Sequence, residues 1–274
     1  MKISIVTVLF FVISPLCAQP ADSTRIRTTA SMLGIGSTEI LDTYLSQEKF
    51  SGTGISFLNI TEWQNAGSRW STVVQQEANL STTNDRSDKA DELQGDYGLF
   101  WGRYYDCRLP GDRLRLQAGG LLNGNLGFIY NTVNSNNPAQ ARLSAQLMPS
   151  LIASYTLPLP SSIRRHFRRP PLLRYELDLP LAGLMFSPNY GQSYYEIFSQ
   201  GHYDHNLVPT TFLSAPTFRQ QLSLDWNFAR SWTLRVGYLG HYQQAEVNNL
   251  KSHVYHHRVM IGVVRRFQTL FYRP

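Results

Sequence analysis

Cysteine is scarce in this chain of 274 residues, which contains only Cys17 and Cys107. Cys17 lies in an N-terminal segment with the features of a cleaved leader, so the mature chain would keep Cys107 alone. A single cysteine cannot form an intramolecular disulfide, and a fold stabilised by disulfides is therefore excluded.

Long apolar runs are also missing. The N-terminal run Ile3–Ile13 follows Lys2 and is too short for a spanning helix, which needs about 20 apolar residues. The pattern is typical of a secretory signal peptide, with cleavage expected near Ala18 and Gln19. No spanning helix is expected after it, and the mean hydropathy of −0.26 fits a β-barrel, whose spanning strands are only half apolar.

Acidic residues are outnumbered, with 19 Asp and Glu against 25 Lys and Arg, a formal net charge of +6. Removing Lys2 with the leader gives 6 − 1 = +5. Basic clusters can bind nucleic acid, but in an exported chain we expect anionic lipid headgroups as the partner and no nucleic acid. An ordinary solvated turn is the alternative for the cluster formed by Arg164, Arg165, Arg168 and Arg169.

Strict alternation of apolar and polar residues is what the chain does have. In Trp232–Val247 the apolar face runs through Leu234, Val236 and Tyr238 to Tyr242. Period-2 alternation predicts a strand with one apolar face, and aromatic residues at both ends are typical of outer-membrane barrels. Trp232 to Tyr242 spans roughly 33 Å, or about 25 Å along the membrane normal at a tilt of about 40°. The expected interface aromatics are Trp226, Phe228, Trp232, Tyr242, Tyr255 and Phe267.

The same pattern recurs along the chain and predicts an all-β, transmembrane antiparallel barrel of about ten strands, with twelve as the alternative. The expected strands are Ile26–Gly36, Ser51–Trp63, Trp70–Thr82, Leu93–Asp106, Arg113–Tyr130, Arg142–Leu157, Leu172–Phe186, Thr217–Phe228, Trp232–Val247 and His253–Phe267. The expected domains are a signal peptide at 1–18, a periplasmic segment at 19–25, the barrel at 26–267 and a tail at 268–274.

The segment 187–216 is predicted to be a long extracellular loop. About thirty residues is long for a loop without structure. Tyr194–Ser199 and Val208–Leu213 could form a further hairpin, which would make twelve strands, or the loop could fold into the lumen.

Two turn signals suggest a register for the last three strands. Closing the hairpins at Ala229–Ser231 and at Asn248-Asn249 places apolar and aromatic residues opposite one another and opposite charges across from each other, with Asp225 and Arg235 in the lumen. The predicted pairs are Leu224–Val236, Asp225–Arg235, His241–His256, Tyr242–Tyr255 and Glu246–Lys251, with Phe228 opposite Trp232.

The polar faces of these strands carry charges that would point into the lumen. Eight strands leave just enough room for side chains, so a lumen of ten is expected to be largely plugged. We interpret the charges as a paired polar core, with a substrate path as the alternative. The expected luminal charges are Arg115, Arg174, Glu176, Asp178, Asp225, Arg235 and Arg258.

A histidine-rich stretch offers the only candidates for catalysis. His202, Asp204 and His205 lie close together in sequence, and His241 is predicted to face the lumen. Histidine and aspartate can supply a general base. Their spacing matches no strong metal or hydrolase pattern, so we expect no metal and no cofactor.

Two segments, Ser187–Phe198 and Leu234–Leu250, resemble a family of uncharacterised exported proteins from Bacteroidota, defined as a domain of unknown function. The resemblance covers most of the mature chain. It implies an outer-membrane barrel in a Gram-negative bacterium, and it brings no known activity.

The sequence therefore favours a non-enzymatic outer-membrane barrel, either a narrow porin-like pore or a structural and surface-interaction protein. The expected partners are outer-membrane lipids or lipopolysaccharide, the barrel-assembly machinery and a possible small solute. The alternative function is a hydrolase that modifies lipid or lipopolysaccharide with a histidine as general base.

Overall fold

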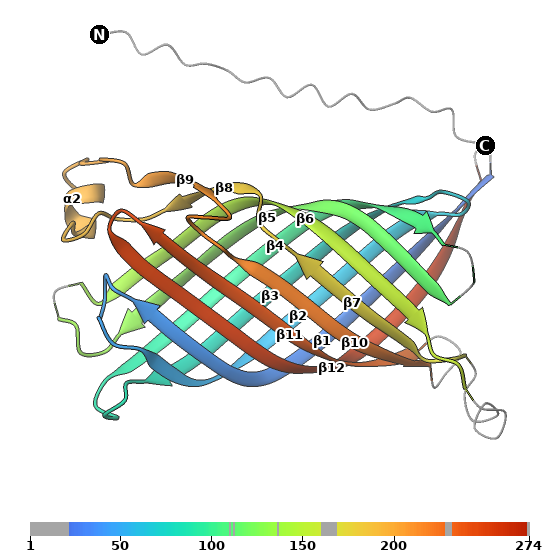
Figure 1. Cartoon of the computed structure of the whole chain (residues 1–274), viewed down its shortest axis with the longest axis horizontal. Coiled ribbons are helices and arrows are strands. Elements are labelled where there is room, and N and C mark those ends of the chain that lie inside the picture. The colour runs from blue at the N-terminus through green and yellow to red at the C-terminus, as the bar shows by residue number, and fades with distance from the viewer. Residues whose placement is uncertain are drawn as a thin grey trace, which may run out of the picture.

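The computed structural model describes residues 22–109, 111, 113–135, 137–159, 169–227 and 232–272. Within them the chain is almost wholly β (Figure 1). The strands are β1 (Asp22–Asp42), β2 (Phe50–Asn65), β3 (Trp70–Asn84), β4 (Asp91–Arg108), β5 (Leu114–Asn131), β6 (Ala139–Thr156), β7 (Leu172–Asp178), β8 (Ala182–Phe186), β9 (Leu207–Thr211), β10 (Phe218–Asn227), β11 (Trp232–Val247) and β12 (Leu250–Tyr272), and the helix is α2 (Tyr194–Phe198).

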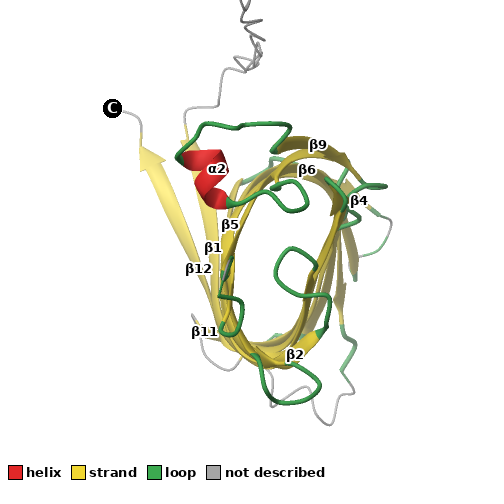
Figure 2. Ribbon diagram, turned by 90° about the vertical axis from the view of Figure 1, so that its left-hand side faces the viewer, coloured by secondary structure: helices red, strands yellow, loops and turns green. Residues whose placement is uncertain are grey.

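Ten of these strands close into an antiparallel barrel. Their order is β5-β4-β3-β2-β1-β12-β11-β10-β7-β6, and pairing of β5 with β6 completes the ring. The barrel is oval when viewed along its axis (Figure 2). β1 begins and β12 ends at the right-hand end in Figure 1, which we call the terminal end, and α2 lies at the opposite, loop end. The predicted fold class is confirmed.

The expected strand Leu172–Phe186 is wrong as one continuous barrel strand, because it divides at Pro180. The backbone N–H groups of Leu179 and Leu181 donate to carbonyl groups of β6. Because alternate residues of a strand direct their backbone groups to opposite neighbours, the nitrogen of Pro180 points towards β10. Proline has no N–H to donate there, and pairing with β10 ends at Asp178. β8 continues along β6 and takes β9 as its other neighbour, which adds two short strands outside the ten-stranded ring.

Within the long loop, the expected strand Tyr194–Ser199 is wrong, because α2 occupies this segment. Ser193 caps the helix and exchanges hydrogen bonds with Glu196, which is the capping-box arrangement. Val208–Leu213 does contribute a strand, β9, but it pairs with β8. The barrel therefore has the ten strands predicted, and the twelve-stranded alternative is wrong, because β8 and β9 are additional to the closed ring.

Hydrogen bonds hold the α2 segment against the loop end of the barrel. The Tyr44 hydroxyl donates to the Gln192 carbonyl at 3.0 Å, and the Tyr194 hydroxyl donates to the Gln140 side chain at 2.7 Å. Burial raises the pKa of Tyr44 to about 12, so its hydroxyl remains a donor at neutral pH. The rings of Tyr44 and Tyr194 pack edge to face, with their centroids 5.8 Å apart.

The register predicted for the last hairpins is confirmed wherever the structure describes it. Asp225 pairs with Arg235, and Tyr242 pairs with Tyr255. The remaining confirmed pairs are Leu224–Val236, His241–His256 and Glu246–Lys251, whereas Phe228 and the Ala229–Ser231 turn lie outside the described residues. Asn248 and Asn249 have φ of 51° and 60°, as a type I′ turn requires.

The barrel extends further at its terminal end than expected. β1 begins at Asp22 and β12 ends at Tyr272, and these two residues pair with each other. Residues 22–25 and 268–272, expected outside the barrel, are therefore strand residues. Side-chain alternation weakens there, but the backbone ladder needs only a neighbouring strand and continues.

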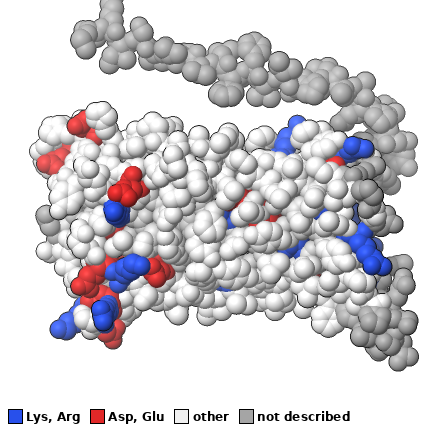
Figure 3. All heavy atoms as spheres, in the orientation of Figure 1, with Lys and Arg blue, Asp and Glu red and all other residues white. Residues whose placement is uncertain are grey.

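Charged side chains gather at the two ends of the outer wall, with few between them (Figure 3), and large apolar side chains are exposed along the intervening band. Leu33, Ile35 and Val259 have exposed fractions of 65%, 65% and 66%, which soluble proteins seldom allow in a contiguous patch. Trp232 and Phe267 lie towards the terminal end, and the Tyr242–Tyr255 pair lies towards the loop end. Among the described residues no helix has the length and apolar character needed to cross a membrane.

Candidate functional site in the barrel lumen

Arg219 is the centre of a charged cluster in the middle of the lumen and is completely buried. Its Nε donates to Glu77 at 2.7 Å, and its Nη1 donates to Asp178 at 3.1 Å. His241 Nδ1 lies 2.9 Å from the other oxygen of Glu77. The guanidinium also lies 4.6 Å from the centre of the Phe100 ring, a cation–π contact. We call Arg219, Glu77, Asp178, Glu176 and His241 the Arg219 cluster.

Arg258 forms a second buried cluster beside the first, made largely of hydroxyl groups. Its Nη2 donates to Thr38 at 2.7 Å and to Ser81 at 2.9 Å, and its Nε donates to Ser56 at 2.9 Å. A Cβ at Gly54 would lie 2.6 Å from Nη2, so the missing side chain makes room for the guanidinium.

His256 links the Arg258 hydroxyl cluster to a carboxylate. Its Nε2 lies 3.2 Å from Asp96, and its Nδ1 lies 3.2 Å from Thr38. His241 and His256 are opposed on the paired strands β11 and β12, and their ring centroids lie 6.5 Å apart, which brings the two clusters into contact.

An apolar layer fills the lumen on the terminal side of these clusters. Along β1 the inward residues change from Thr38 to Met32 and Ala30, and then to Thr28. The side chains of Phe100, Leu121 and Met148 in this layer are less than 2% exposed, so side chains fill the cross-section of the lumen at this level. The layer consists of Ala30, Met32, Leu58, Ile60, Val73, Phe100, Tyr104, Leu121, Met148, Ile152, Leu239, Met260 and Val264.

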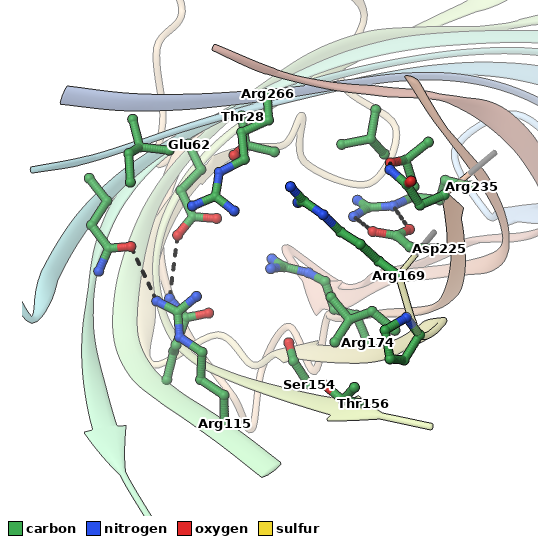
Figure 4. Close-up of a pocket in the computed structure, with 18 of the residues that line it drawn as sticks. Thr28, Glu62, Arg115, Ser154, Thr156, Arg169, Arg174, Asp225, Arg235 and Arg266 are labelled. Carbon is green, nitrogen blue, oxygen red and sulfur yellow. Dashed lines mark hydrogen bonds and ion pairs between the residues drawn. The ribbon is translucent and has the colours of Figure 1, made fainter. Parts of the chain in front are cut away.

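Beyond the apolar layer the lumen widens into a cavity of about 680 Å³ at the terminal end, which we call the vestibule (Figure 4). Its lining is drawn from eight strands and the segment just before β7. Six arginines line it, against two carboxylates, Glu62 and Asp225. The six are Arg113, Arg115, Arg169, Arg174, Arg235 and Arg266.

Three of the six arginines are neutralised by neighbours. Arg235 makes a bidentate pair with Asp225 at 2.6 and 2.7 Å. Arg115 lies 2.8 Å from Asp106, and Arg174 lies 2.7 Å from Glu176 of the Arg219 cluster. These contacts hold the guanidinium groups in place on the vestibule wall.

The other three arginines, Arg113, Arg169 and Arg266, are exposed in the vestibule. Their side chains make no hydrogen bond or ion pair with any residue that the structure describes. Arg113 directly precedes β5, Arg169 precedes β7, and Arg266 lies in the last part of β12. Figure 4 shows Arg169 and Arg266 on different sides of the cavity. The vestibule is therefore a positively charged cavity with free donors.

The structure places all seven of the expected luminal charges inside the barrel. Asp178, Glu176 and Arg258 lie in the buried clusters, and Arg115, Arg174, Arg235 and Asp225 line the vestibule. The expected set omitted Arg219, Glu77, Asp96, Arg113 and Arg266. Each of these stands on the polar face of an alternating segment, and that parity was the signal for them.

The four candidates for a general base do not form one site. His202, Asp204 and His205 are exposed on the loop end, where His205 contacts Asp204. His241 is buried in the lumen and contacts Glu77. No group of three His, Cys, Asp or Glu suited to a metal occurs among the described residues.

Arginines also gather on the outer wall at the terminal end, beside aromatic rings. Arg265 lies 3.6 Å from the Trp232 ring centre, and Arg103 lies 5.2 Å from that of Trp70. These strands are neighbours in the ring, from β4 through β3, β2, β1 and β12 to β11. We call this set the outer arginine band: Arg25, Arg27, Arg69, Arg103 and Arg265, with Trp63, Trp70, Tyr105 and Trp232.

Several solved membrane barrels resemble the chain in structure. The transport unit of the autotransporter AIDA-I from Escherichia coli matches with a TM-score of 0.39 and 8% identity, covering 94% of each chain. Neisserial surface protein A matches with a TM-score of 0.36 and 9% identity, covering 89% of this chain and 97% of that one. An outer-membrane channel from Pseudomonas putida F1 matches with a TM-score of 0.35 and 11% identity, covering 91% and 97%.

At such scores and identities these resemblances carry no inference about activity. A comparison with curated proteins found no match. A family model, in contrast, matches residues 3–274. The chain thus belongs to the family described as protein of unknown function DUF3316.

Proposed function

We propose that this protein is a closed, non-conducting barrel of the bacterial outer membrane, with its terminal end in the periplasm. Of the two non-enzymatic functions that the sequence favours, a structural or binding role fits the lumen better than a narrow pore. The leader at residues 1–18 would direct export, and the resemblance to exported Bacteroidota proteins suggests a Gram-negative host of that group.

One observation carries the proposal: the middle of the lumen is filled by side chains. Arg219 and Arg258 are each 0% exposed, and the apolar layer adds Phe100, Leu121 and Met148 at 0%, 0% and 1%. Moving these groups aside would break paired charges in a desolvated interior, which costs about 3–5 kcal/mol for each broken pair. Ions and solutes should therefore not pass.

The outer wall supports insertion in a lipid bilayer. A contiguous apolar band between aromatic rims is the arrangement by which membrane barrels meet lipid. Short periplasmic turns and longer outer loops are usual in such barrels, and here α2 and the longest described connection lie at the loop end. This arrangement supports the proposed position of the terminal end in the periplasm.

Lipids and the assembly machinery are the partners that we propose for the outer wall. The outer arginine band lies at the level where lipid headgroups meet the wall, and its cations suit anionic phosphates. β12 runs to Tyr272 and supplies a long terminal strand that the barrel-assembly machinery could recognise.

Electrical recording from the refolded full-length protein in a planar bilayer tests the proposal. Heat-modifiable mobility on a gel would first show that the barrel has folded, and a porin added to the same bilayer would show that channels can be seen. We expect no steps from this protein. Steady, ion-selective steps from the folded barrel would overturn the closed lumen and favour the narrow pore.

A further inference from the structure

We propose that the vestibule is a binding site for a phosphate-bearing anion that enters from the periplasm. The inference rests on the proposed closed barrel, because an anion that enters a blocked cavity is a ligand rather than a permeating ion. Its starting point is the imbalance in the vestibule lining, where six arginines face two carboxylates.

The free arginines have the chemistry that recognises a phosphate. A guanidinium presents a rigid fork of N–H donors that matches the oxygens of a phosphate, and it stays charged at every physiological pH. Arg113, Arg169 and Arg266 have no partner among the described residues, so their donors are available. Bringing three such cations together is unfavourable unless an anion neutralises them.

The paired arginines give the cavity a fixed frame. Arg235 is clamped by Asp225 at two contacts, and Arg174 is tied to the buried Glu176. Hydroxyl groups elsewhere in the lining, from Thr28, Ser154 and Thr156, add neutral donors. A frame held by the barrel wall reduces the ordering that a ligand would otherwise impose.

The dimensions point to a small ligand or a single headgroup. A volume of about 680 Å³ lies within the range of about 300–1,000 Å³ that is usual for small-molecule sites. The apolar layer closes the inner side of the vestibule, so a ligand must enter and leave through the terminal end. A free phosphate compound and the headgroup of an anionic phospholipid share the chemistry that this cavity selects.

Binding of inorganic pyrophosphate to the refolded full-length barrel in a zwitterionic detergent tests the proposal by calorimetry. The luminal variant Arg113→Gln/Arg266→Gln removes two free guanidinium groups from the vestibule. The matched control Arg86→Gln/Lys89→Gln also removes two cations, but from the exposed turn between β3 and β4 at the loop end, far from the vestibule and from the outer arginine band. We expect the luminal variant to weaken binding about tenfold or more, and the control to change it less than about twofold.

Native mass spectrometry from vesicles of phosphatidylglycerol and phosphatidylcholine separates the two sources. Phosphatidylglycerol retained by the wild type and the control, but lost from the luminal variant, would identify a lipid headgroup as the ligand even if pyrophosphate binds weakly. Absence of both ligands, or equal losses in the luminal variant and the control, would overturn the proposal. Should the luminal variant not fold, Arg113→Lys/Arg266→Lys keeps the charge and should weaken binding by loss of the fork alone. If the protein shows no conductance steps and also binds neither ligand, the closed barrel is supported and this inference is rejected.

Discussion

Replacing Arg219 by methionine should test how strongly the Arg219 cluster stabilises the barrel. Methionine has a similar length and packs well in an interior, so the substitution removes mainly the charge and the hydrogen bonds. Two buried carboxylates, Glu77 and Asp178, would lose their shortest cationic contacts, at 2.7 and 3.1 Å. Glu176 would keep Arg174.

The expected loss in free energy of unfolding follows from these contacts. Removing one partner of a buried ion pair costs about 3–5 kcal/mol, because the other charge stays desolvated. Glu77 keeps His241 at 2.9 Å and Asn79 at 3.1 Å, and Asp178 keeps the Ser150 hydroxyl. We therefore expect a loss near the lower limit, about 3 kcal/mol, or about a hundredfold in the unfolding equilibrium.

Equilibrium unfolding in urea, followed by tryptophan fluorescence in lipid vesicles, measures this loss. Arg86→Met is the control, since Arg86 is exposed in the turn between β3 and β4, and we expect it to cost less than about 0.5 kcal/mol. The triple variant Glu77→Gln/Asp178→Asn/Arg219→Met removes all three charges and should recover to within about 1 kcal/mol of the wild type. A loss below about 1 kcal/mol in the single variant, or no recovery in the triple, would refute the electrostatic reasoning.

Three further predictions concern the wall, the vestibule and the loop. Cysteines at Tyr242 and Tyr255 should form a disulfide on mild oxidation, because directly opposed residues have Cα atoms about 4.5–5.5 Å apart. Cysteines at Tyr242 and His257, which are not opposed, should react poorly. A non-reducing gel that shows the reverse would contradict the register. Asp225→Arg and Arg235→Asp should each lower the free energy of unfolding in urea by about 3 kcal/mol, because each breaks the bidentate pair. The double exchange should restore most of this free energy, whereas additive losses would show that the two side chains act independently. Hydrogen bonds from Ser193 hold the pKa of Glu196 below its ordinary value of 4.5, so its contribution to α2 is present above that pH and is lost as the pH falls through the lower, folded pKa. Hydrogen exchange of α2 amides, corrected for intrinsic rates, should therefore rise at low pH in the wild type, and an equal rise in Glu196→Gln would contradict this.

Alternation along the chain is enough to predict the wall of the barrel, because each residue faces either lipid or lumen and the two solvents select opposite side chains. The register of the last hairpins also follows from local signals, since Asn248-Asn249 supports the positive φ values of a two-residue turn. The break at Pro180 and the capping box of Ser193 and Glu196 were both visible in the sequence. Apolar alternation and aromatic content suggested strands there and outweighed these two signals.

The luminal clusters could not be predicted in the same way. Arg219 and Glu77 are 142 residues apart, and their contact depends on how far each strand is staggered around the ring. Parity shows that both side chains point inward, but it does not show which of many inward charges will meet. The vestibule raises the same difficulty, because Arg113 and Arg266 line one cavity although they come from the middle and last thirds of the chain.

The pairing of β1 with β12 has a consequence for the order of folding. Asp22 pairs with Tyr272, so the ring closes between strands that are separated by most of the chain. Loop closure of this length is slow, and until it occurs β1 and β11 each present an unpaired edge on which a second chain could add a strand. A nascent chain lacking β12 would therefore be an open, aggregation-prone sheet, and a holding chaperone in the periplasm would be needed until the final strand arrives.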